Sequence, residues 1–229
     1  MSSGSSAFAA GLLGIVLAHS AIAGGATVPE ETPMAPESMA VRDWSGLYFG
    51  FALATPRGDN SWRQASDGLE LVPGPWDGEA MMLSLGRDWQ SDRLTYGAQV
   101  SVGNGDFSAS PTNAAFISCS ACASRLSDLI TLRGRLGLAT GQFLVFATGG
   151  VARANFTATN VFGLQSVREA TMTGWTAGLG VERMIGDNLS LSVSYDYLDF
   201  GKLDLPVYLP TAQTDVTLGL VQVGLNVHW

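Results

Sequence analysis

The sequence predicts an all-β fold, namely an eight-stranded antiparallel up-and-down transmembrane β-barrel. Apolar residues alternate with small or polar ones in segments of about ten residues, as in strands that cross a bilayer at a tilt. Short and long connections follow each other in strict alternation. Only 14% of the residues are charged and the mean hydropathy is +0.20, yet no run of about 18 apolar residues could form a spanning helix.

The composition excludes two other classes of protein. With 12 basic and 20 acidic side chains, the chain has a formal net charge of −8, so it lacks the basic surface of a nucleic-acid-binding protein. A hydrophobic content of 46% excludes a disordered chain, because it is enough to bury a core.

The N-terminus predicts a cleaved signal peptide over residues 1–23. Ala7–Ala18 is an apolar stretch, and Ala21-Ile22-Ala23 supplies the small residues of a cleavage site. No Lys or Arg precedes the apolar stretch, which departs from the usual pattern. The alternative, a short buried helix, is disfavoured because no capping residues or amphipathic pattern surround it.

Residues 24–43 are interpreted as a disordered lead-in to the barrel, which would occupy residues 44–229. Pro29, Pro33 and Pro36 lie among three glutamates in this segment. Proline cannot donate a ladder hydrogen bond and the acids repel one another, so a packed strand is not expected here.

Eight strands are predicted in order. They are Leu47–Thr55, Glu79–Trp89, Leu94–Gly103, Asp128–Thr140, Phe143–Asn155, Trp175–Glu182, Leu189–Tyr197 and Val221–Trp229. In the first strand four bulky apolar residues share one face, with Tyr48 and three small residues opposite, and a similar separation of apolar from small or polar residues recurs in the third, fourth, sixth, seventh and eighth. Arg87 interrupts the apolar stripe of the second strand. The fifth is apolar on both faces, so no facing is assigned to it.

The connections indicate which ends of the strands lie together. The short ones are Gln90–Arg93, Gly141-Gln142 and Gly186–Asn188, and the long ones are Pro56–Trp76, Asn104–Ser124, Phe156–Arg168 and Gly201–Gln213. All short turns therefore lie at one barrel end and all long polar loops at the other. Bacterial outer-membrane barrels have this asymmetry, with the short turns in the periplasm.

The two faces of the strands differ in a way that favours a membrane barrel. One face is bulky and apolar, while the other carries Gly, Ala, Ser and Thr with a few long polar groups. A soluble barrel would carry its bulky residues inward, so we expect the apolar face to meet lipid. Aromatic residues also gather at the strand ends, where amphipathic rings favour the headgroup level. We place Trp44, Trp89, Tyr96, Phe143 and Trp229 at the turn end, and Trp175 and Tyr197 at the loop end.

Five segments carry a resemblance to a known family. Trp44-Ser45-Gly46-Leu47-Tyr48-Phe49-Gly50 resembles the W-[ST]-G-[FL]-Y-x-G opening of small outer-membrane β-barrel proteins of alphaproteobacteria. Further similar segments are Leu132-Arg133-Gly134-Arg135-Leu136-Gly137, Ala147-Thr148-Gly149-Gly150-Val151-Ala152, Gly174-Trp175-Thr176-Ala177-Gly178-Leu179-Gly180-Val181-Glu182 and Val223-Gly224-Leu225-Asn226-Val227-His228-Trp229. The resemblance implies an eight-stranded surface-antigen or porin-like barrel in the outer membrane. The family often has an inward Glu where this chain has Ser194, and Asp196 supplies a carboxylate two residues later.

The C-terminal strand also resembles an assembly signal. Val223, Leu225 and Val227 alternate up to the terminal aromatic Trp229, where the family usually ends in Phe. The resemblance implies that the outer-membrane assembly machinery recognises these residues.

The two cysteines, Cys119 and Cys122, fall in the second long loop. In an oxidising exported setting a local disulfide is the preferred interpretation, with two free thiols as the alternative. A zinc site would need about four ligands, and a redox motif would need a helix N-terminus. His228 is the only mature histidine and lies at the periplasmic end, so no Ser-His or Asp-His catalytic site is expected. We predict no enzymatic activity, no metal and no cofactor.

Four charged residues are predicted to form an ionic network in the lumen. Arg133 and Arg135 share the inward face of one strand, and Glu182 and Asp196 lie on the inward faces of two others. The interior of an eight-stranded barrel is only wide enough for side chains to fill it, so long guanidinium groups could reach these carboxylates. Gln99, Gln222 and Asn226 could satisfy the remaining donors. The alternative is that these groups sit unpaired in lumen water.

Together these observations predict a non-enzymatic integral outer-membrane barrel with a structural role and a loop-mediated surface interaction. Its expected partners are outer-membrane lipid, the assembly machinery and an unidentified surface ligand, and no nucleic acid. A small porin-like diffusion channel is the first alternative. A soluble ligand-binding barrel is the second.

Overall fold

Ten antiparallel strands make up the computed structural model, which describes residues 41–64, 70–110, 123–162, 164–205 and 212–229. The strands are β1 (Gly46–Arg57), β2 (Asp59–Gln64), β3 (Glu70–Asp77), β4 (Ala80–Ser91), β5 (Leu94–Ala109), β6 (Ala123–Thr140), β7 (Phe143–Phe162), β8 (Leu164–Met184), β9 (Leu189–Leu205) and β10 (Ala212–His228). Within these ranges no helix is long and apolar enough to cross a membrane. The predicted signal peptide lies outside the described residues.

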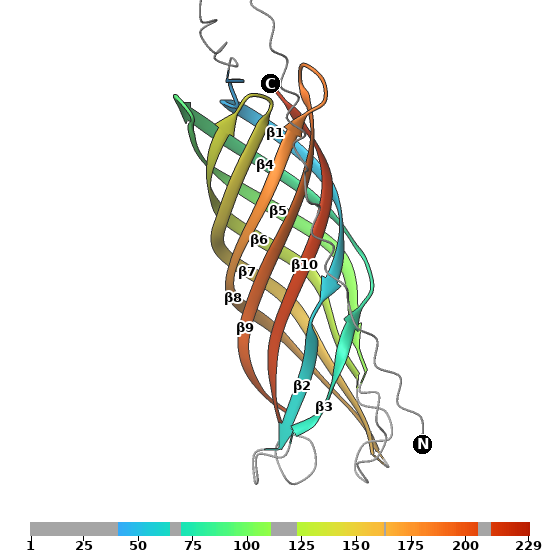
Figure 1. Cartoon of the computed structure of the whole chain (residues 1–229). Helices are drawn as coiled ribbons and strands as arrows, with labels where there is room; N and C mark the ends of the chain where they lie inside the picture. The colour runs from blue at the N-terminus through green and yellow to red at the C-terminus, as the bar shows by residue number, and fades with distance from the viewer. Residues whose placement is uncertain (1–40, 65–69, 111–122, 163, 206–211) are drawn as a thin grey trace, which may run out of the picture. The chain divides into compact units, whose positions relative to one another are not determined.

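Eight of the strands form a closed ring in the order β1, β4, β5, β6, β7, β8, β9 and β10 (Figure 1). The last strand pairs with the first from Tyr48–His228 to Arg57–Gly219, which leaves the ring without an edge. The predicted eight-stranded antiparallel barrel is therefore confirmed.

The two additional strands, β2 and β3, extend the barrel beyond the first and second strands of the ring. After Gly58, β2 resumes pairing with β10, and before Gly78, β3 pairs with β5. Both glycines have positive φ, of 101° and 119°. A Cβ on Gly78 would lie 2.2 Å from the carbonyl oxygen of Asp106. The predicted long loop Pro56–Trp76 is thus wrong in extent, because much of it is a kinked continuation of the barrel.

The other strands also run further toward the loop end than predicted. β7 and β8 extend through most of the predicted loop Phe156–Arg168, and β6 begins at Ala123 instead of Asp128. Asp128 has a φ of 53° at a bulge in β6, where the pairing with β7 shifts. The bulge inverts the alternation, so that Leu126 and Leu129 both point inward. A strict period of two could not be followed across it.

The bulky apolar face points away from the interior, as predicted. Leu179 of β8 is 69% exposed, and Leu132 and Leu138 of β6 are 58% and 59% exposed. The residues that alternate with them along each strand are more buried. The structure also settles the facing of β7, where Leu144 and Thr148 point inward and the intervening Val145 points outward.

Aromatic pairs lie at both ends of the exposed apolar surface. The rings of Trp89 and Tyr96 stack at 5.9 Å at the turn end, and those of Trp175 and Tyr197 lie 5.4 Å apart toward the loop end. Trp44 lies at the turn end, as predicted, but not on the outer face with the other aromatic residues, because its side chain is 1% exposed and packs inside the barrel. It precedes the first strand, so the strand alternation does not hold it on the outer face.

Residues 41–43 contact the turn end of the barrel, although we had assigned them to the lead-in. The backbone N–H of Arg42 donates to the carbonyl oxygen of Gly141 at 3.1 Å, and its guanidinium donates to the carbonyl oxygen of Asp187. Val41 packs against the cluster that contains Trp44. The remainder of the predicted lead-in lies outside the described residues.

Replacing Leu179 with Arg should destabilise the barrel by about 2–4 kcal/mol, because the charge would face the hydrocarbon between the aromatic Trp175 and the turn that follows β8. Urea unfolding in phospholipid vesicles would measure this, with Leu179→Met as the control of similar volume. An equal free energy of unfolding for the two variants would contradict a lipid-facing position.

Candidate functional site

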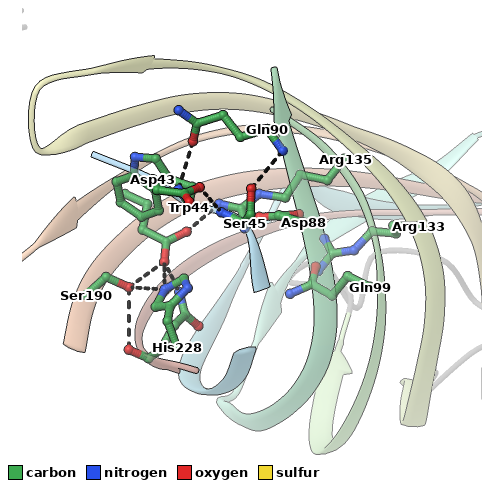
Figure 2. A network of polar contacts seen from close by, with 12 residues as sticks. Asp43, Trp44, Ser45, Asp88, Gln90, Gln99, Arg133, Arg135, Ser190 and His228 are labelled. Carbon is green, nitrogen blue, oxygen red and sulfur yellow. Dashed lines mark hydrogen bonds and ion pairs between the residues drawn. The ribbon is translucent and has the colours of Figure 1, made fainter. Parts of the chain in front are cut away.

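The middle of the barrel interior holds a network of buried ion pairs (Figure 2). Arg133 Nη1 lies 2.6 Å from Asp196 Oδ1 of β9. Arg135 Nη1 lies 2.9 Å from Asp88 Oδ2 of β4, and its Nη2 pairs with Glu182 Oε2 of β8. All five side chains are at most 7% exposed. The structure thus brings together the four residues that we expected in the lumen and adds a fifth.

Asp88 is the residue that the sequence analysis missed. It lies between Arg87 and Trp89, on the opposite face from the apolar stripe of β4, so the alternation places it inward. The outward arginine at position 87 had obscured this pattern. The carboxylate of Asp88 changes the charge balance of the network, which contains two guanidinium groups and three carboxylates.

Neutral side chains complete the network in two different ways. The amide oxygen of Gln99 accepts a hydrogen bond from Arg133 Nη2 at 2.8 Å, as we expected for a leftover donor. Gln222 instead donates to Asp196 at 2.5 Å, and Asn226 donates to Glu182 at 2.7 Å. These amides bind oxygen atoms of the carboxylates, which helps to offset the excess of acids.

Arg135 is also held between two aromatic rings. Its Cζ lies 4.0 Å from the centroid of the Phe146 ring and 5.3 Å from that of Tyr48. A guanidinium is weakly hydrated and is attracted to the faces of aromatic rings, so it can occupy such a position. The rings restrict Arg135 to the orientation in which it reaches both carboxylates.

His228 closes the network at the turn end. Its Nε2 lies 3.0 Å from Glu182 Oε1 and 3.0 Å from Ser190 Oγ, and this hydroxyl also donates to Glu182. The ring packs against Trp44 and Tyr48, with centroids 5.7 and 5.5 Å apart. A catalytic histidine bridges a serine and an acid through its two different nitrogens, whereas here one nitrogen contacts both. The arrangement is that of a buried, hydrogen-bonded polar cluster that fills the turn end of the interior.

Apolar clusters lie on either side of the charged network. The turn-end cluster contains Trp44, Ala139, Leu144 and Met184. The outer cluster is larger, and its bulkiest members are Trp76, Phe107, Leu126, Phe156, Phe200 and Leu218. Trp76 Nε1 donates to the carbonyl oxygen of Thr217 at 2.9 Å, which fixes the end of β3 over this cluster. We had expected small residues throughout the lumen, so this apolar filling is a correction.

Little free volume remains beside the ion pairs. A cavity of about 40 Å³ is bordered by Ser84, Ser101 and Thr148 together with the two arginines. A buried water occupies roughly 10–15 Å³ on this measure, so about three water molecules would fill it. Among the described residues, a small polar cavity therefore lies beside the ion pairs.

The remaining predicted site residues lie at the surface or outside the described residues. Val223, Leu225, Val227 and Trp229 all point outward and are 44–60% exposed. The backbone of Trp229 exchanges two hydrogen bonds with Leu47, so the last residue takes part in barrel closure. Cys119 and Cys122 are not among the described residues. In the part of the chain that the structure describes, no group of three potential ligands could hold a metal ion.

Comparisons with known proteins agree with this architecture. The model of the outer membrane protein beta-barrel domain family matches residues 33–228. The 31 kDa outer-membrane immunogenic protein of Brucella melitensis biotype 1 is 31% identical, over 92% of this chain and 94% of the relative. The 22 kDa outer membrane protein of Rhizobium leguminosarum bv. viciae is 24% identical, over 87% of this chain and 83% of the relative.

The fold is also similar to that of a solved structure. The outer membrane protein OprG from Pseudomonas aeruginosa superimposes with a TM-score of 0.56 at 15% sequence identity. The match covers 81% of this chain and 96% of the other. At this identity the similarity concerns the fold alone.

The coupling between Arg135 and Glu182 can be measured with Arg135→Gln, Glu182→Gln and the double variant. Arg135→Gln should cost on the order of 3–5 kcal/mol, because it leaves the buried carboxylates of Asp88 and Glu182 without their guanidinium. Glu182→Gln should cost less, because Arg135 keeps its ion pair with Asp88. The double variant should cost clearly less than the sum of the two. Urea unfolding in detergent gives the three free energies, and additive values would contradict the coupling.

A surface ion pair offers the matched control. Arg125 and Asp106 also pair directly, but their side chains are 60% and 54% exposed. Exposed pairs typically contribute about 0–1 kcal/mol, so Arg125→Gln and Asp106→Asn should have small effects in the same assay.

Proposed function

The chain belongs to the outer membrane protein beta-barrel domain family and lies in the cell outer membrane, and we propose that it serves there as a closed, non-enzymatic scaffold for recognition at the cell surface. The single observation that carries this proposal is the filled interior. Two apolar clusters enclose a layer of paired charges, so the lumen contributes to the stability of the barrel instead of providing a path for solutes.

The ion pairs and the apolar clusters depend on each other. Paired charges interact more strongly where water is excluded, and the clusters at either side keep bulk water away from them. Trp44 and Trp76 supply the largest side chains at the two ends. A diffusion channel would need an aqueous path past both clusters, which disfavours the porin-like alternative. The exposed apolar belt disfavours the soluble barrel.

The loop end carries the features of a surface for recognition. Beyond the apolar belt, the outward residues of β6, β7 and β8 become polar and bond to one another. Asn155 donates to Asp128 at 3.0 Å and accepts from Thr171 at 3.0 Å. Toward the end of β9, Gln213 of β10 donates to Asp204 at 2.7 Å. These contacts join neighbouring strand extensions at the loop end.

The absence of enzymatic activity is part of the proposal. The Ser190, His228 and Glu182 side chains are buried at the turn end, and their hydrogen bonds do not form a proton relay. We further propose that the outer-membrane assembly machinery recognises the outward residues of β10. The surface ligand is the remaining expected partner.

Purified protein in planar lipid bilayers should produce no stable ion conductance, because its interior is packed. A variant with both Trp44→Ala and Trp76→Ala removes the largest side chain from each cluster and should show at least intermittent conductance. Stable conductance by the unmodified protein would contradict a closed lumen.

The proposed orientation can be tested by labelling intact cells in a Cys119→Ser, Cys122→Ser background. An impermeant maleimide should label Asp204→Cys near the loop end and should leave Asp187→Cys in the β8–β9 turn unlabelled until the cells are lysed. Both residues are exposed, so accessibility within the folded protein is matched. The reverse labelling pattern would refute surface recognition by the loop end.

A further inference from the structure

A shallow groove of about 410 Å³ crosses the lipid-facing surface of β5, β6 and β7. Its floor consists of Ala98, Gly134 and Gly149, which are direct partners on the three neighbouring strands. Tyr96 and Leu136 form one side, and Trp89 lies at one end. These residues face outward, and the lining also includes Arg135 and Thr148, whose side chains point into the lumen.

The two glycines in this floor are not required by the packing of the barrel. A Cβ on Gly134 would come no closer than 3.7 Å to another heavy atom, and one on Gly149 no closer than 4.0 Å. Their backbone conformations have no positive φ. By contrast, a Cβ on Gly150 would lie 2.0 Å from the carbonyl oxygen of Leu132. At positions 134 and 149, therefore, the missing side chains have one visible effect, which is the groove itself.

The groove lies on a line of paired residues that crosses the apolar belt obliquely and continues past the groove at both ends. Arg87, Ala98, Gly134, Gly149 and Ala177 are successive partners on β4 to β8. This line spans four strand spacings, or ~19 Å at ~4.8 Å each. It begins beside the aromatic pair of the turn end and finishes two residues from the aromatic Trp175 of the loop end. An extended acyl chain would fit along such a line.

Arg87 places a positive charge at the turn end of the groove. Its guanidinium lies 5.2 Å from the centroid of the Trp89 ring. Among the described residues, the Arg87 side chain forms no hydrogen bond or ion pair. The outward positions of β4 to β8 between the two aromatic pairs contain no Asp or Glu in the described structure. An arginine at this depth extends toward the headgroups, where an anion can compensate its charge.

We propose that this groove binds a phospholipid of the periplasmic leaflet that has an anionic headgroup. The headgroup pairs with Arg87, and one acyl chain lies over Ala98, Gly134 and Gly149. A second copy of this chain fits less well, because the same face of that copy would bring no carboxylate to Arg87. The turn end faces the periplasm, so the occupant is a glycerophospholipid of the inner leaflet.

The test uses protein folded into vesicles of phosphatidylcholine that contain a minor fraction of phosphatidylglycerol. After extraction in mild detergent, native mass spectrometry counts the lipids that remain bound. Phosphatidylglycerol should be enriched about fivefold over its fraction in the vesicles, as expected for one basic side chain near an anionic headgroup. Arg87→Gln should remove the enrichment but retain a bound lipid. Gly134→Leu with Gly149→Leu should reduce the retention of both lipids.

Two controls separate this site from general effects of the membrane surface. Arg183 also lies over an aromatic ring at the turn end, 5.3 Å from the centroid of Phe143, but away from the groove. Arg183→Gln should leave the enrichment unchanged, and Val145→Leu on the lipid face should leave retention unchanged. Heat-dependent gel migration checks that each variant is folded.

Three results would overturn the proposal. The first is retention of the two lipids in their vesicle ratio by the unmodified protein. The second is an equal loss of enrichment in Arg183→Gln. The third is a lipid-free dimer that the two leucine substitutions dissociate, which would assign the groove to a second copy.

Discussion

The constraint on which the rest of the structure depends is that every backbone polar group inside the hydrocarbon must find a partner within the protein. The ladder between β1 and β10 meets this constraint by closing the ring. Closure also fixes the phase of every strand, because directly paired residues share a face. The inward positions of all eight strands are thereby locked to one another, and so are the outward ones.

The buried charges follow from this locked phase. Asp88, Arg135 and Glu182 come from three strands that are not neighbours, yet their side chains meet because each occupies an inward position at a similar level. The apolar clusters above and below then determine how strongly these charges interact. The same side chains that exclude water also make an unpaired charge costly, so the layers have to be complete to stabilise the fold.

The sequence was sufficient to predict the strands that cross the membrane, since lipid on one side and a narrow interior on the other impose a strict alternation. Outside the bilayer that requirement disappears. The bulge at Asp128 shifts the phase, and the apolar residues Phe156 and Phe200 turn inward as in a soluble protein. Trp44 could not be placed either, because the segment before the first strand follows no alternation. For the charged site, the strand pattern indicated four members but not Asp88. The outward Arg87 interrupts the apolar stripe of that strand, so the inward position of the next residue was not recognised.

The kinks at Gly58 and Gly78 divide the first hairpin into two parts whose sequences are under different structural constraints. The part that lies within the ring must keep the geometry of the membrane barrel. The sequences of β2 and β3 are constrained mainly by contact with water and with neighbouring strands at the rim. Sequence changes in this outer part can therefore accumulate without altering the register of the ring. Apart from Trp76, which belongs to the outer apolar cluster, the hairpin is in effect an exchangeable module, on which surface variation or an engineered peptide epitope could be displayed from an unchanged membrane anchor.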